Sequence, residues 1–284
     1  MKQGINLGYV CYRRNSEEKR DFTEALALCR NAGFTEFDYL SSVLTDDYRE
    51  TAHFCREALD RAGCTVHQSH CPFFRYQENG IRQFRKFAPR AVEAASVLGA
   101  KYLVIHADEY RPAGAYEPDD VFERNYDLMA PIVELCLKYG ISPAFENLFE
   151  DHLSGPSERS RFCAEPEELL ALVERFHDPR VGVCLDSGHA QCSRGKAHIG
   201  VLELLEKHLF CTHIHDNYYG GDLHLPAFFG TIDWERFMHR LSVSGYSGNF
   251  TWELVYGRFP DPLLPDYLAF LHRIGEYLLN MRTE

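Results

Sequence analysis

Histidine and carboxylate side chains recur at the ends of the short apolar segments of this 284-residue chain, which has 14 histidines. Imidazole and carboxylate groups are the side chains that most often bind divalent metal ions and transfer protons. If the fold brings the segment ends together, these groups would form a metal centre equipped for acid–base chemistry. The residues in these positions are His70, His106, Glu146, Asp186, His189, His213, His215, Asp222, His224 and Glu253.

Three of the carboxylates are hard to explain without a partner. Glu146 and Glu253 each follow an aromatic residue inside an apolar segment, and Asp186 directly follows another such segment. Burying a lone carboxylate costs several kcal/mol unless it is paired or binds a metal. Lys and Arg are absent from these segments, so the carboxylates would repel one another when ionised. We therefore predict a divalent ion, and nitrogen and oxygen ligands suit zinc or manganese better than calcium.

Nucleophilic chemistry has weaker support in the sequence. The chain has no G-x-S-x-G elbow, no P-loop and no G-x-G-x-x-G motif. Ser187 stands beside Asp186, where it is expected to support a metal ligand rather than attack a substrate. Cys184 and Cys211 fall inside apolar segments and are expected to be small buried side chains.

The apolar segments alternate with amphipathic ones from end to end of the chain. Helical periodicity predicts helices over Gln83–Ala100, Asp119–Gly140, Pro166–Phe176, Ile199–His208, Asp233–Gly245 and Pro265–Met281. Strands are predicted over Ile5–Tyr12, Glu36–Leu40, Thr65–Pro72, Tyr102–Ala107, Ser142–Leu148, Val181–Leu185, Leu209–Ile214 and Asn249–Leu254.

Eight strand–helix units in 284 residues give about 35 residues per unit, which favours an α/β protein with a (β/α)₈ TIM barrel fold. No linker or shift in composition interrupts the series, so we expect one domain over residues 1–284. The polar stretch Glu150–Glu165 is predicted to be a long loop. The active sites of such barrels lie at the carboxyl ends of the strands, and six of the eight predicted strands end in a carboxylate or an imidazole.

Composition excludes several classes of protein. The chain has 30 Lys and Arg against 42 Asp and Glu, a formal charge of −12, so a surface that binds nucleic acid is not expected. No segment approaches the ~20 apolar residues of a membrane span, and residues 1–12 do not resemble a signal peptide. Ten cysteines without a C-x-x-C pair are typical of reduced thiols, so we expect a cytoplasmic protein, and a homo-oligomer stays open.

The ordered set of motifs resembles the xylose isomerase-like barrel superfamily. This superfamily contains sugar isomerases, ketose epimerases, inosose dehydratases and the second family of apurinic-site endonucleases. The resemblance covers nearly the whole chain. It rests on Phe145-Glu146-Asn147, Leu185-Asp186-Ser187-Gly188-His189-Ala190, His213-x-x-Asp216, Asp222-x-His224 and Trp252-Glu253.

The resemblance implies that one divalent ion is held by Glu146, Asp186, His213 and Glu253. His213 is preferred because the family pattern is His-x-x-acid, but His215 stays open, since residues i and i+2 of a strand point the same way. In the ketose epimerases the two glutamates remove and return a proton, and the metal polarises the carbonyl and stabilises the enediolate. The resemblance thus implies an isomerase or epimerase of a sugar-like small molecule with Glu146 and Glu253 as catalytic residues.

The endonuclease branch is the alternative, because its three-zinc cluster also finds its ligands here. They would be His70, His106, Glu146, Asp186, His189, His213, Asp222, His224 and Glu253. The chain departs from both branches: Tyr219 replaces an epimerase arginine, and Phe228-Phe229-Gly230 replaces a common endonuclease Gly-Glu-Gly. The residues outside the four-ligand set would bind either further zinc ions or sugar hydroxyls. A barrel that binds a ligand without catalysis is a third reading.

Overall fold

Eight parallel strands form the centre of the computed structural model, which describes residues 1–13, 16–73, 78–107, 116–150, 161–218, 221–256 and 259–281. Tyr219 and most of the predicted loop Glu150–Glu165 lie outside these ranges. The strands are β1 (Gln3–Asn6), β2 (Glu36–Asp38), β3 (Thr65–His70), β4 (Tyr102–Ile105), β5 (Ser142–Glu146), β6 (Gly182–Asp186), β7 (Leu209–His213) and β8 (Phe250–Trp252).

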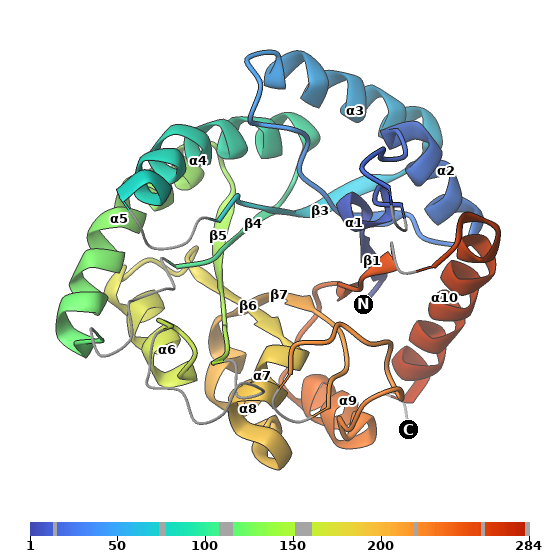
Figure 1. Ribbon diagram of the computed structural model, residues 1–284. Coiled ribbons are helices and arrows are strands. Elements are labelled where there is room, and N and C mark those ends of the chain that lie inside the picture. Colours follow the sequence, from blue (N-terminus) through green and yellow to red (C-terminus); the bar gives the residue numbers. More distant parts are fainter. Residues whose placement is uncertain are drawn as a thin grey trace.

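Each strand pairs with its neighbour in the sequence, and β1 also pairs with β8. The sheet closes between β7 and β8 through a parallel bridge from Ile214 to Trp252. This arrangement confirms the predicted (β/α)₈ barrel, which Figure 1 shows with its helices outside the strands. Because all eight strands are parallel, their carboxyl ends meet at one rim.

Helices follow the strands and form the outer layer (Figure 1). None of the helices in the described ranges is both long and apolar enough to cross a membrane. They are α1 (Leu7–Val10), α2 (Phe22–Asn31), α3 (Tyr48–Ala62), α4 (Glu78–Leu98), α5 (Pro118–Lys138), α6 (Pro166–Arg175), α7 (Ser187–Arg194), α8 (Ile199–Leu205), α9 (Trp234–Val243) and α10 (Leu264–Met281).

The apolar side chains form two cores. The larger lies between the strands and the helices and includes Phe37, Phe145 and Trp252, each at most 1% exposed. The smaller fills the barrel below the carboxyl rim with Tyr102, Val104, Ala144, Cys184 and Cys211. The two cysteines are thus buried side chains, as the sequence indicated, and the polar residues at the rim rest on an apolar floor.

Two short helices at the rim were not predicted. The first apolar segment leaves the strand at Asn6, whose side chain accepts a hydrogen bond from the Tyr9 amide at 3.1 Å and begins α1. In the same way the Asp186 carboxylate accepts from the His189 amide at 2.7 Å and begins α7. Asn and Asp are favoured at this position because they satisfy free amides in the first helical turn. The cap of α7 holds His189 close to Asp186.

Candidate metal centre

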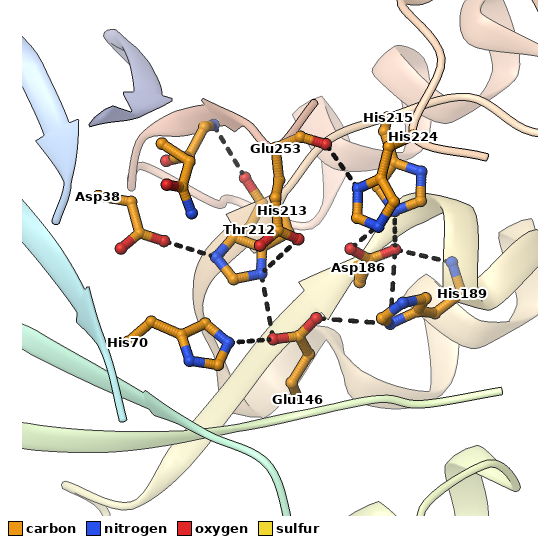
Figure 2. Close-up of polar contacts among 12 residues, drawn as sticks. Asp38, His70, Glu146, Asp186, His189, Thr212, His213, His215, His224 and Glu253 are labelled. Carbon is orange, nitrogen blue, oxygen red and sulfur yellow. Dashed lines mark hydrogen bonds and ion pairs between the residues drawn. The ribbon is translucent and has the colours of Figure 1, made fainter. Parts of the chain in front are cut away.

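The structure brings all ten predicted site residues to the carboxyl rim, where they form one connected group. Figure 2 labels all of them except His106 and Asp222. They come from the ends of β3 to β8 and from the segments that follow these strands. Glu146, Asp186, His213 and His215 are at most 1% exposed, whereas His70 and His224 face the opening of the barrel. The predicted residues therefore share one largely buried site.

Glu146 lies in the middle of the group and meets four imidazoles. Its Oε2 lies 3.1 Å from His213 Nδ1, 3.2 Å from His106 Nε2 and 3.5 Å from His70 Nε2. Its Oε1 lies 3.4 Å from His189 Nδ1. Burial opposes the charged carboxylate, but His213 and His106 outweigh this effect and hold the pKa of Glu146 well below its usual range. Glu146 is therefore ionised at neutral pH.

His213 has carboxylates at both ring nitrogens. Nδ1 lies 3.1 Å from Glu146 Oε2 and 3.4 Å from Glu253 Oε2. Nε2 lies 2.8 Å from Oδ2 of Asp38, at the end of β2. Burial favours the neutral ring, but Glu253 and Glu146 raise the pKa of His213 well above its usual range. In the absence of a metal His213 is thus an imidazolium that neutralises three buried carboxylates in part.

Asp38 is a site residue that the sequence analysis missed. It is 1% exposed, and its Oδ2 also lies 3.4 Å from the amide nitrogen of Gln68. Gln68 in turn accepts a hydrogen bond from the Thr251 hydroxyl at 3.1 Å. This chain of contacts fixes Asp38 against Nε2 of His213. A carboxylate in this position makes Nδ1 the nitrogen that would bind a metal.

The site has two parts. Glu146 and Glu253 both contact His213 in the first part, and Asp186 and His215 form the second. His215 Nε2 lies 2.9 Å from one oxygen of Asp186 and 3.0 Å from the other. The Asn147 side chain bonds to both the amide and the carbonyl of Asp186, at 2.7 and 3.0 Å. Burial opposes ionisation of Asp186, but His189 and His215 lower its pKa. Asp186 therefore meets His215 directly rather than His213, and both histidines of β7 and its extension face the site.

Asp222 and His224 cover this second part from the loop after β7. His224 Nε2 lies 3.1 Å from Asp222 Oδ2, and the His224 ring stacks on His215 with centroids 4.2 Å apart. His224 has a positive φ of 48°, which is uncommon for a residue other than glycine. Burial lowers its pKa, but the bond to Asp222 outweighs this and raises the pKa of His224 to about 10. By the same balance the carboxylates of Asp186 and Asp222 raise the pKa of His189 to about 9.

Asp216, the acid of the His-x-x-acid motif, has a structural role instead. Its carboxylate accepts hydrogen bonds from the amides of Asn217, Phe228 and Ile232 and from the indole of Trp234, at 2.9 to 3.1 Å. These bonds bind both ends of the loop that carries Asp222 and His224. Asp216 therefore shapes the loop and is not a further metal ligand.

The donor set fits a divalent cation. Five largely buried carboxylates (Asp38, Glu146, Asp186, Asp222 and Glu253) make ion pairs only with histidine in the described part of the chain. Several sets of possible ligands among the described residues have donor atoms within 4.8 Å of one another. They include the sets His70, His213 and Glu253; His70, His106 and Glu146; Asp186, His189 and His215; and His215, His224 and Glu253. A cation would replace the protons that now hold these carboxylates together.

Gly188 allows His215 to reach Asp186. A Cβ at position 188 would lie 1.9 Å from His215 Cε1 and 2.6 Å from the Asn217 amide nitrogen. Gly188→Ala is therefore expected to lower the free energy of unfolding by about 1–3 kcal/mol, as overpacking does. Chemical denaturation measures this loss.

Gly200 is the matched control, because it also lies in a helix and a Cβ there would meet nothing within 4 Å. Gly200→Ala is expected to raise the unfolding free energy by about 0.5–1 kcal/mol, since alanine favours helices. Equal effects of the two substitutions would contradict the close packing of His215 on α7.

A family model described as xylose isomerase-like TIM barrel matches residues 26–274. The uncharacterized protein MJ1311 of Methanocaldococcus jannaschii is 26% identical over 159 residues, which are 56% of this chain and 52% of that protein. The uncharacterized protein y4fM of Sinorhizobium fredii is 24% identical over 273 residues, 83% of this chain and 81% of the relative. The match thus spans about half the length of the first relative.

Solved structures share the fold over nearly the full length. A D-tagatose 3-epimerase-like protein is 20% identical with a TM-score of 0.78, and the match covers 100% of both chains. An L-ribulose 3-epimerase is 15% identical with a TM-score of 0.76, over 100% of this chain and 96% of its own. The IolI protein with a bound zinc atom is 18% identical with a TM-score of 0.73, over 98% of both chains.

Proposed function

The chain belongs to the xylose isomerase-like TIM barrel family, and we propose that it is a divalent-metal-dependent isomerase or epimerase of a sugar or related polyhydroxylated molecule. The observation that carries the proposal is the pair Glu146 and Glu253, whose carboxylates both lie within 3.4 Å of His213 Nδ1. The names of the structural neighbours, an L-ribulose 3-epimerase and a D-tagatose 3-epimerase-like protein, agree with this chemistry.

The proposed ligands of the ion are Glu146, Asp186, His213 and Glu253. His215 is the further nitrogen donor, because it already contacts Asp186. Zinc or manganese would suit this set of nitrogen and oxygen donors, and the neighbour IolI binds zinc. When bound, the ion would polarise the substrate carbonyl and offset the negative charge that develops on its oxygen.

The proton transfer itself is assigned to the glutamates. The Glu146 carboxylate would accept a proton from the carbon next to the carbonyl. Glu253, whose Oε2 lies 3.4 Å from the same nitrogen of His213 as Glu146, would return a proton to the other face. His70, His106, Asp222 and His224 surround the pair and would hydrogen-bond the sugar hydroxyls.

Zinc-dependent phosphoester cleavage is the second candidate, favoured by the size of the donor set. His70 and His106 meet at Glu146, and His189 and His224 meet at Asp222. These two groups lie on either side of the four proposed ligands and could hold further ions. Three zincs of equal occupancy in the purified protein, with cleavage of abasic DNA, would favour this function over isomerisation.

Deuterium exchange tests the proposed function. The metal-loaded protein is incubated in D₂O with a panel of free and phosphorylated ketoses, and the products are read by NMR and mass spectrometry. We expect deuterium on the carbon next to the carbonyl of at least one sugar, because the removed proton exchanges with solvent before it is returned. A panel without any exchange would contradict the proposal.

Replacing Asp38 with Asn is expected to weaken metal binding about 10- to 100-fold, as the loss of a partner to a metal-binding histidine does. The Asp38 carboxylate accepts Nε2–H of His213, and its charge makes Nδ1 a better metal ligand. The substitution removes this charge. Competition with a chelator measures the metal affinity. Asp60→Asn, an exposed acid of α3 paired with Arg56, is the control. A loss of stability with unchanged metal affinity would show that Asp38 only supports the fold.

A further inference from the structure

A cavity of about 600 Å³ opens beside the candidate metal centre. Its floor includes Asp38, His70 and Glu253, and its walls come from α1, the start of α2 and the segments after β2 and β3. A substrate whose reacting carbon lies between the two catalytic glutamates would extend into this space. The cavity volume falls within the ~300–1,000 Å³ of sites for drug-sized ligands, which exceed a single sugar ring.

The walls of this cavity are rich in aromatic side chains. The Phe22 and Tyr39 rings pack together with centroids 4.8 Å apart, so part of the wall is already formed. Tyr12, Leu44 and Phe73 are 47 to 60% exposed although they are large and apolar. Aromatic and aliphatic surfaces of this kind bind the faces of rings. The wall therefore favours a ligand with a flat or apolar part.

The cavity offers little to a negatively charged ligand. Arg20 lines it but is 4% exposed and donates to the carbonyls of Val10 and Tyr12 and to the Asp261 carboxylate. Lys19 lies at the edge with its ammonium over the Tyr12 ring, 4.4 Å from the centroid. Among the described residues that line the cavity, Lys19 is thus the only cation not neutralised by a carboxylate.

The floor of the cavity carries polar side chains. His70 is 17% exposed, and its imidazole and the Glu253 carboxylate have donor atoms within 4.8 Å of each other. An imidazole and a carboxylate at the bottom of a cavity can both hydrogen-bond ligand hydroxyls. The polar part of the ligand would then lie at the floor and its apolar part toward the opening.

We propose that the substrate is a carbohydrate that has a carbonyl group and also carries an uncharged, ring-shaped substituent, and that an aryl glycoside is a binding analogue of it. The carbohydrate lies on the floor against His70 and Glu253, and the substituent packs against Tyr12, Tyr39 and Leu44. This inference rests on the proposed function for the orientation of the sugar. It makes the cavity, rather than the metal centre, the part of the site that selects the substrate.

Binding of matched glycosides tests this inference. Methyl and phenyl β-glycosides of glucose, galactose, mannose and xylose are titrated into the metal-loaded full chain by calorimetry. At least one phenyl glycoside is expected to bind about tenfold or more tightly than its methyl counterpart, because the ring buries apolar surface on the aromatic wall. The phosphate of the same sugar is expected to bind more weakly than the phenyl glycoside.

Two variants locate the preference. Tyr12→Ala and Leu44→Asp change exposed wall residues and are expected to remove most of the tenfold difference. Tyr277→Ala, which changes an exposed tyrosine on α10, is the control and is expected to leave the difference unchanged. Equal affinities of methyl and phenyl glycosides, a preference that survives both wall variants, or tighter binding of sugar phosphates would overturn the inference.

The two experiments separate this inference from the proposed function. Exchange of deuterium into free ketoses without a preference for phenyl glycosides would overturn this inference alone. A preference for phenyl glycosides without exchange into any ketose would overturn only the proposed function.

Discussion

Glu146→Gln is expected to lower the rate of proton exchange from the epimer whose proton faces Glu146 by about 100- to 10,000-fold, the usual contribution of a positioned base. The amide keeps the size of the side chain but can no longer accept the proton. The substitution also removes the charge shared by His213, His106, His70 and His189. Metal content must therefore be measured in the same samples, and exchange is compared at equal metal occupancy.

Glu253→Gln distinguishes a two-base mechanism from a general loss of function. If the glutamates act on opposite faces of the reacting carbon, each variant loses epimerisation but retains exchange from the one epimer whose proton faces the remaining glutamate. Glu36→Gln is the control, because Glu36 lies in β2 at the other end of the barrel, paired with Lys2 at 2.6 Å. Normal epimerisation by Glu146→Gln at full metal occupancy would refute its role as a base.

The barrel could be predicted because each strand–helix unit carries its own local signals. Gly33, Gly63, Gly99, Gly140 and Gly245 follow helices, and all five adopt a positive φ, which glycine favours at helix ends. Pro166 begins α6 as expected. The ends of the strands were less certain, because apolar residues continue into the loops. The predicted segment Ile5–Tyr12, for example, is a strand only as far as Asn6.

That uncertainty explains why Asp38 was missed. The apolar segment Glu36–Leu40 appeared to end two residues later, so Asp38 was counted as part of the strand rather than as its end. The structure ends β2 at Asp38, where the register against β3 shifts. Its contact with His213 joins residues 175 positions apart. Only the closed barrel brings them together, and no local pattern contains that information.

The sequence also could not predict which carboxylates His213 and His215 would contact. His213 and His215 alternate along the chain and therefore face the same side, as the sequence indicated. In the sheet Asp186 is paired with His213, yet its carboxylate meets His215. This choice depends on the absence of a side chain at Gly188 and on the cap that Asp186 forms at α7. The sequence could propose the ligands but not their partners.

Asp186→Ala is expected to release the metal ion and abolish activity while the barrel stays folded. Asp186 is fully buried, and its oxygens contact His215 and the His189 amide. Its removal takes away one proposed ligand. His189 keeps Glu146 and Asp222 as partners, and His215 keeps Asp222. The lost cap of α7 is expected to cost about 0.5–2 kcal/mol, and the substitution leaves the two apolar cores unchanged.

Metal analysis after dialysis, together with circular dichroism, checks this prediction. The ratio of metal to protein should fall from about one to near zero, with an unchanged far-ultraviolet spectrum. Asp178→Ala is the control, because Asp178 lies before β6 at the opposite end of the strand and pairs with Arg180 at 2.6 Å. If Asp186→Ala retained one ion per chain, Asp186 would not be a ligand, and the ion would be held around Glu146, His213 and Glu253. His215 would then serve the substrate rather than the metal, because its partner in the structure is Asp186.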